Sequence, residues 1–135
     1  MAKKIAEQLI DTLVESGVER IYAVTGDSLN EVNEAVRKNH KIQWIHVRHE
    51  ETGAYAAAAE AQLTGRIGCC AGSSGPGHVH LINGLYDAQR SGAPVIAIVK
   101  ELYGIGFLKV FSSEFSAGDG RSDCNDRCSR PLGIV

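Results

Sequence analysis

The chain has 135 residues, enough for one domain, and its 14 Lys and Arg against 16 Asp and Glu leave a net charge of −2. Hydrophobic residues make up 44% of it, as in globular proteins, which argues against wholesale disorder. This charge balance offers no broad basic surface for a phosphate backbone, so we expect no nucleic-acid partner.

The sequence also allows a prediction of the cellular compartment. No apolar run approaches the roughly 20 residues of a membrane span, so we expect no transmembrane segment. Residues 1–4 lead directly into an amphipathic pattern, and we expect no secretory signal. The cysteines are two neighbours and one spaced pair, which is no disulfide framework: Cys69, Cys70, Cys124 and Cys128. We therefore expect a cytoplasmic protein.

The first part of the chain alternates helix and strand patterns. Apolar residues at i, i+4 and i+8 predict a helix that starts near Ile5 and ends at Gly17. The apolar run 21–24 predicts a strand buried on both faces. Ser28 and Glu31 have the spacing of a capping box, which predicts that a second helix starts there.

The alternation continues to about residue 99. It predicts a strand over 42–47, an alanine-rich helix over 51–63 closed by Gly65, a strand over 67–71, a tight loop over 72–77, a helix over 78–90 and a strand over 94–99. The helix over 78–90 is predicted from Val79, Ile82, Leu85 and Tyr86. This order indicates an α/β fold, a parallel sheet with helices on both faces. Ligands of such sheets bind outside the carboxyl ends of the strands, where segments 25–28, 48–51 and 72–77 fall.

The end of the chain has a different composition. Residues 112–130 are rich in Ser, Gly, Asp and Arg, and Phe115 is the one large apolar side chain among them. Such a segment cannot offset its ordering entropy by burial. We expect a partial domain over 1–111 and a divergent, disordered tail over 112–135.

The glycine-rich loop over 72–77 matches no familiar motif completely. Gly75 and Gly77 begin a dinucleotide fingerprint, but its third glycine would stand where the chain has His80, and no P-loop lysine follows. Pro76 replaces the last glycine of a nucleophile elbow, which disfavours a serine hydrolase. An ordinary strand-to-helix turn remains the alternative to a functional loop.

Histidines near the strand ends could suggest a metal. They have no familiar zinc spacing, so we expect no metal site among them: His46, His49, His78 and His80. Ordinary hydrogen-bonded loop histidines are the simpler interpretation.

Glu50 stands where a predicted strand passes into the alanine-rich helix. A carboxylate is favoured at a helix N-terminus, so it could serve that end alone. It could equally face a ligand across the strand ends. Glu51 is the better candidate for the purely structural role.

Four separate segments point to a family. They are 24–30, 48–51, 59–65 and 75–85, which read VTGDSLN, RHEE, AEAQLTG and GPGHVHLINGL. In order and spacing this set resembles the N-terminal pyrimidine-binding domain of thiamine-diphosphate enzymes, a flavodoxin-like α/β fold, over roughly residues 4–99. Within that family it most resembles the pyruvate oxidases, also called quinone-dependent pyruvate dehydrogenases.

The resemblance implies roles for several residues. It implies that Glu50 is catalytic, since the family's glutamate hydrogen-bonds a nitrogen of the cofactor's aminopyrimidine ring and exchanges a proton with it. It implies that Gly26, Gly75 and His80 line the cofactor site together with Glu50, and that His49 lines the substrate pocket.

The resemblance also implies what lies beyond this sequence. Pyruvate is the implied substrate, and the implied partners are further copies of the chain or complementary thiamine-enzyme domains. Magnesium and FAD are expected only in the full-length family enzyme, which has three domains. We therefore expect a truncated or frameshifted sequence whose product is inactive alone. The alternatives are a fragment of an acetolactate-synthase-like thiamine enzyme and a non-catalytic α/β interaction module.

Overall fold

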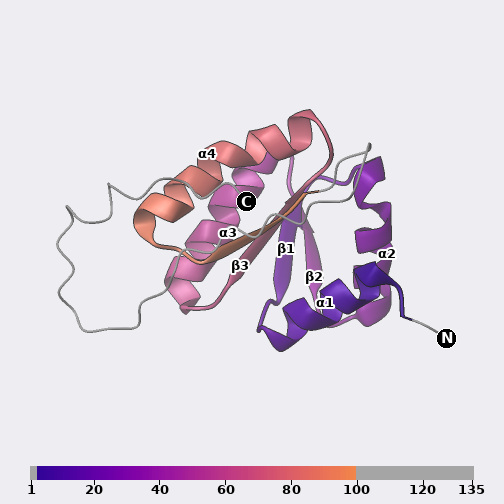
Figure 1. The fold of residues 1–135 in the computed structure, drawn as a ribbon. Helices are drawn as coiled ribbons and strands as arrows, with labels where there is room; N and C mark the ends of the chain where they lie inside the picture. The colour runs from indigo at the N-terminus through magenta and orange to yellow at the C-terminus, as the bar shows by residue number, and fades with distance from the viewer. Residues whose placement is uncertain (1–2, 100–135) are drawn as a thin grey trace.

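The computed structural model describes residues 3–99 (Figure 1). Its elements are α1 (Ile5–Glu15), β1 (Arg20–Ala23), the 3-10 turn η1 (Asp27–Leu29), α2 (Asn30–Asn39), β2 (Gln43–His46), α3 (Glu50–Thr64), β3 (Gly68–Gly72), α4 (Pro76–Ser91) and β4 (Val95–Val99). The predicted domain boundary at 111 and the predicted tail over 112–135 lie outside the described residues.

The four described strands form one parallel sheet in the order β2-β1-β3-β4. Helices α1 and α2 cover one face, and α3 and α4 cover the other (Figure 1). This confirms the predicted α/β fold with a parallel sheet between helices. The strand order reverses between β1 and β3, and ligands of parallel sheets bind at the carboxyl ends of the strands at such a switch point.

Two apolar clusters fill the spaces between sheet and helices. The first lies under α1 and α2 and contains large side chains, including Ile10, Leu13, Val32 and Val36. The second lies under α3 and α4 and is built mostly from alanines with Leu81 and Leu85. Small side chains let α3 and α4 approach the sheet and each other closely.

Helix α4 differs from its prediction in start and in orientation. It begins at Pro76, two residues early, because proline suits the first helical turn and Gly75 takes φ +73° as the N-cap. Of the apolar residues from which it was predicted, Leu85 is buried, whereas Val79, Ile82 and Tyr86 are exposed on its outer side.

No helix within residues 3–99 is long and apolar enough to cross a membrane.

The contact between α3 and α4 depends on a missing side chain. A Cβ on Gly84 would lie 2.5 Å from Ala54 Cβ and 2.8 Å from the backbone N of Tyr55. The second of these atoms belongs to the backbone, so the clash cannot be relieved by a rotamer change. The glycine therefore sets the spacing of the two helices.

We expect Gly84→Ala to lower the free energy of unfolding by about 1–3 kcal/mol, the usual cost of overpacking. Alanine's higher helix propensity, worth about 1 kcal/mol, reduces this loss without reversing it. Denaturant unfolding followed by circular dichroism measures the change. The exposed control Gln89→Ala should stay within about 0.5 kcal/mol of wild type. A Gly84→Ala chain as stable as wild type would contradict this packing.

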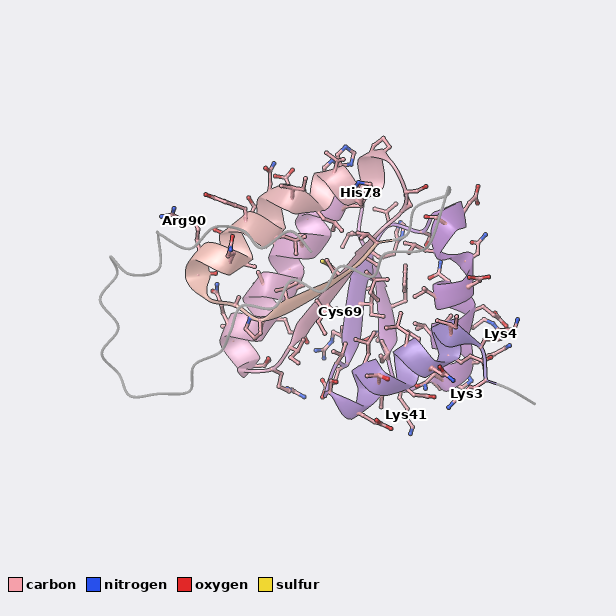
Figure 2. All side chains as sticks on the ribbon, viewed as in Figure 1. Lys3, Lys4, Lys41, Cys69, His78 and Arg90 are labelled. Carbon is pink, nitrogen blue, oxygen red and sulfur yellow. The ribbon has the colours of Figure 1, made fainter. Side chains whose placement is uncertain are left out.

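Two thiols lie in the interior on strand β3, one on each face of the sheet. Cys69, labelled in Figure 2, belongs to the first apolar cluster. Cys70 belongs to the second, and both thiols are free and fully buried. Burial raises the pKa of Cys70 to about 12 and raises that of Cys69 well above its usual range. Both groups are therefore protonated at neutral pH, which makes them poor nucleophiles.

We expect these thiols to resist a thiol reagent in the native chain and to react once the chain is unfolded. A Cys124→Ser/Cys128→Ser background removes the remaining cysteines, so that the colour released by Ellman's reagent reports Cys69 and Cys70 alone. Rapid labelling at pH 8 without denaturant would refute their burial.

Candidate functional site

Two loops at the carboxyl ends of β1 and β3 are in direct contact. A Cβ on Gly26, after β1, would lie 2.5 Å from Ser73 Cβ, after β3. The backbone N–H of Ser74 donates a hydrogen bond of 2.9 Å to Ser28 Oγ. The glycine permits the approach and the hydrogen bond fixes it, so the loops form one wall.

Ser28 therefore has a role other than the predicted one. It lies in η1, and the N-cap of α2 is Leu29, with no capping side-chain hydrogen bond. The predicted capping box was therefore wrong. The buried Ser28 hydroxyl instead accepts a hydrogen bond from Ser74, which is 46 positions away in the sequence. Spacing along the chain could not reveal a partner so distant.

Glu50 is the first residue of α3 and lies beside this wall. The residue is 8% exposed, so its carboxyl group is largely shielded from water. His49 is the N-cap, and its Nδ1 accepts a hydrogen bond of 3.3 Å from the backbone N–H of Glu51. Since a neighbour caps the helix, the Glu50 carboxyl is available for another partner.

That partner within the chain is His80, on the first turns of α4. Its Nδ1 lies 3.1 Å from Glu50 Oε2. Its ring stacks on that of His49, with centroids 4.5 Å apart and planes at 25°. The fold thus brings together three predicted site residues, two adjacent in sequence and one 30 positions away.

Gly77 completes the surroundings of Glu50 and was not among the predicted site residues. A Cβ there would lie 3.0 Å from Glu50 Oε1 and 2.6 Å from Ser73 Oγ. Predicted Gly75, by contrast, has nothing within 4 Å of such a Cβ, and its glycine is required by φ +73°. The sequence motif predicted a functional loop. Only the structure shows that Gly77, and not Gly75, lies beside Glu50.

Glu51 contacts a second helix, whereas the sequence predicted that it serves the N-terminus of its own helix. Its Oε1 accepts a hydrogen bond of 3.2 Å from Asn83 Nδ2, which ties α3 to α4 on the exposed side. Its backbone N–H is the one that His49 caps. The two neighbouring glutamates therefore differ in environment, since Glu50 is buried beside the two loops and the Glu51 side chain is partly exposed.

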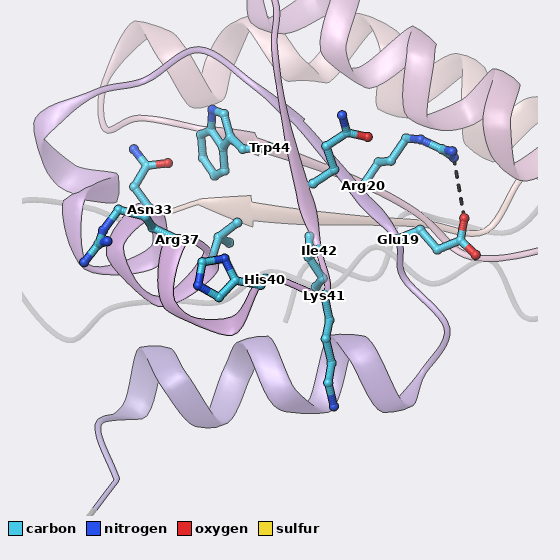
Figure 3. A pocket seen from close by; sticks show the side chains of 10 residues that line it. Glu19, Arg20, Asn33, Arg37, His40, Lys41, Ile42 and Trp44 are labelled. Carbon is cyan, nitrogen blue, oxygen red and sulfur yellow. Dashed lines mark ion pairs between the residues drawn. The ribbon is translucent and has the colours of Figure 1, made fainter.

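A separate pocket of about 780 Å³ lies beside edge strand β2 (Figure 3). Its lining residues are Glu19, Arg20, Asn33, Val36, Arg37, His40, Lys41, Ile42, Gln43 and Trp44. Arg20 pairs with Glu19 and Glu60, and Arg37 pairs with Glu34, so most of its positive charge is balanced within the chain. It lies where β1 and β2 begin, away from the carboxyl ends at which parallel sheets bind ligands. None of the predicted site residues lines it.

Residues 3–102 match the family model described as "Thiamine pyrophosphate enzyme, N-terminal TPP binding domain". The chain therefore belongs to the thiamine pyrophosphate (thiamine diphosphate) enzymes. Thiamine diphosphate is therefore the cofactor class of this domain.

Individual relatives agree with the family. The chain is 54% identical over 99 residues to an uncharacterized 42.6 kDa protein of Pseudomonas amyloderamosa, covering 73% of this chain and 25% of that protein. It is 49% identical over 92 residues to pyruvate oxidase of Lactiplantibacillus plantarum, covering 67% and 15%. It is 34% identical over 100 residues to a chloroplastic acetolactate synthase of Brassica napus, covering 74% and 15%. The chain thus spans a quarter or less of these relatives.

The residues around Glu50 fit one end of such a cofactor. An aminopyrimidine ring is flat and carries ring nitrogens, which need a hydrogen-bonding group shielded from water. Glu50 offers a buried carboxyl, and Gly77 lies against Oε1, where any larger residue would clash with that oxygen and with Ser73 Oγ. Within residues 3–99, no side chain of the chain itself hydrogen-bonds Oε1.

Proposed function

We propose that Glu50 is the group that binds and protonates the aminopyrimidine ring of thiamine diphosphate, and that Gly26, Gly75 and His80 line that site. The observation that carries this is the buried Glu50 carboxyl at the switch point, with one oxygen beside His80 and the other beside Gly77. When bound, the cofactor supplies a thiazolium carbon that adds to a 2-keto acid and accepts the electrons released with carbon dioxide.

The surroundings of Glu50 suit proton exchange with a ring nitrogen. The first turn of α3 positions the carboxyl beside the two loops, and burial shields it from water. His80 holds Oε2 at 3.1 Å and so limits the rotation of the carboxyl. Glu50 can therefore hold a proton toward the ring or accept it back without moving its backbone.

Pyruvate is the proposed substrate of the complete enzyme. The chain is more similar to pyruvate oxidase than to acetolactate synthase, at 49% against 34% identity, which supports an oxidase. An acetolactate-synthase-like enzyme is the alternative. We assign His49 to the substrate pocket because its side chain is 47% exposed beside the buried Glu50. Magnesium and FAD belong in this proposal to the complete enzyme, and we assign no residue of residues 3–99 to either.

The outer side of α4 supports the proposal that this domain works with others. Val79, Ile82 and Tyr86 are each more than half exposed and follow one side of the helix. Contiguous exposed apolar side chains are typical of association surfaces. We propose homo-oligomers or complementary thiamine-enzyme domains as the partners. A non-catalytic interaction module would use the same surface.

The proposal extends to the cellular compartment of the chain. Cys69 and Cys70 are free and buried, which suits a reducing compartment such as the cytoplasm. The catalytic step would need groups beyond the described domain, so we propose that the 135-residue chain is inactive alone.

Glu50→Gln in a complete enzyme carrying this domain should reduce cofactor activation by about 10²–10⁴-fold, the usual contribution of a general acid–base group. Glutamine keeps the shape and the hydrogen bond but cannot exchange the proton. Loss of deuterium from the thiazolium carbon, followed by NMR, measures the step directly. Glu51→Gln is the matched control and should exchange at the wild-type rate. Near-wild-type exchange in Glu50→Gln would refute the assignment.

The isolated 135-residue chain should bind thiamine diphosphate with magnesium only weakly, because Glu50 and its neighbours contact one end of the cofactor. Calorimetric titration measures this, with magnesium alone as the blank. Micromolar affinity would show that the chain also anchors the diphosphate, contrary to the proposal.

A further inference from the structure

Three metal-ligating side chains meet at the carboxyl edge of the sheet. His49, Glu50 and His80 each offer one ligand atom, and these atoms lie within 4.8 Å of one another. Residues 3–99 contain no other group of three or more His, Cys, Asp or Glu side chains with such spacing. Two imidazoles and one carboxylate are a donor set that zinc enzymes use, with a fourth position left open.

One of the distances among these side chains already matches a tetrahedral site, and the others need movement. Zinc holds nitrogen and oxygen ligands at about 2.0–2.2 Å, which places neighbouring ligand atoms about 3.3 Å apart. His80 Nδ1 and Glu50 Oε2 already lie 3.1 Å apart. The widest separation of 4.8 Å must close by roughly 1.5 Å to reach that spacing. The exposed histidines can supply this movement, while the buried carboxyl stays in place.

The three ligands should not contribute equally. His49 Nδ1 already accepts the hydrogen bond from Glu51 N–H, and its ring is stacked on His80. An ion taking a His49 nitrogen must therefore disturb the cap of α3 or the stacking. Glu50 and His80 face each other with no third residue between them, so they should form the stronger pair.

We infer that His49, Glu50 and His80 form a binding site for a borderline divalent ion such as Zn²⁺. Imidazole with carboxylate favours Zn²⁺, Co²⁺ and Cu²⁺, whereas Mg²⁺ prefers oxygen ligands throughout. The site is distinct from the magnesium assigned to the complete enzyme, and sequence spacing could not find it because His49 and His80 are 31 positions apart.

The ion would have a consequence for the cofactor. The ion would take Glu50 Oε2 beside His80, and a carboxylate bound to a divalent ion is a poorer proton acceptor for a pyrimidine nitrogen at Oε1, so each ligand would weaken the other. This consequence rests on the proposed function, whereas the metal site does not. A chain that binds zinc but fails every test of pyrimidine binding would refute the proposed function and leave the metal site standing.

The test is a calorimetric titration of the 135-residue chain with Zn²⁺, and with Mg²⁺ as the second ion. The Cys124→Ser/Cys128→Ser background is used throughout, because those thiols could bind zinc independently. Co²⁺ reports the geometry, since a four-coordinate cobalt site absorbs visible light far more strongly than aqueous cobalt. The variants are Glu50→Gln, His80→Gln and His49→Gln. His46→Gln, at an exposed position of β2, is the matched control.

We expect one Zn²⁺ per chain and no comparable heat with Mg²⁺. Glu50→Gln and His80→Gln should each weaken zinc binding at least tenfold, His49→Gln less, and His46→Gln not at all. If circular dichroism shows that Glu50→Gln does not fold, the variants His80→Gln and His49→Gln, at exposed positions, still decide the outcome. Zinc affinity that is unchanged in His80→Gln, or absent in the background chain, would overturn the inference.

Discussion

The position of the Glu50 carboxyl is the constraint on which this domain depends. The first turn of α3 holds it beside a wall made by the loops after β1 and β3, and α4 brings His80 within 3.1 Å of it. A buried carboxyl is unfavourable unless hydrogen-bonded, so the approach of His80 and the helix N-terminus both help to keep it there. The two sides of the carboxyl then face different neighbours, a histidine and a glycine.

Glycine contacts make this arrangement possible. Gly84 lets α4 lie against α3 at Ala54, Gly26 lets the first loop touch Ser73, and Gly77 leaves room beside Glu50. At each of these glycines a Cβ would lie 2.5–2.6 Å from a neighbouring atom, closer than a real Cβ approaches. The alanine-rich second cluster serves the same purpose under α3. Close packing on this face of the sheet therefore shapes the surroundings of Glu50, whereas the large side chains under α1 and α2 provide the broader core.

One carboxyl with two neighbouring imidazoles can serve two chemistries. In the two proposals, the proton shared with a heterocycle and the lone pair given to a divalent ion use different oxygens of the same carboxyl, and both benefit from its shielding from water. The family match places the domain among thiamine pyrophosphate enzymes. Val79, Ile82 and Tyr86 are exposed on α4 and form the surface that we propose for association with other domains.

The sequence by itself determined the order of helices and strands, the parallel sheet, and the place of Glu50 at the start of an alanine-rich helix. These follow from local periodicity, turn residues and helix-end preferences, which act over a few neighbouring positions. Only the tertiary structure decided that Ser28 joins two loops, that Gly77 lies beside Glu50, and that His80 stacks on His49. The tertiary structure also shows that Val79 and Ile82 face outward from α4. Those facts depend on how helices rotate and pack across the sheet, and that rotation is set by contacts between residues dozens of positions apart.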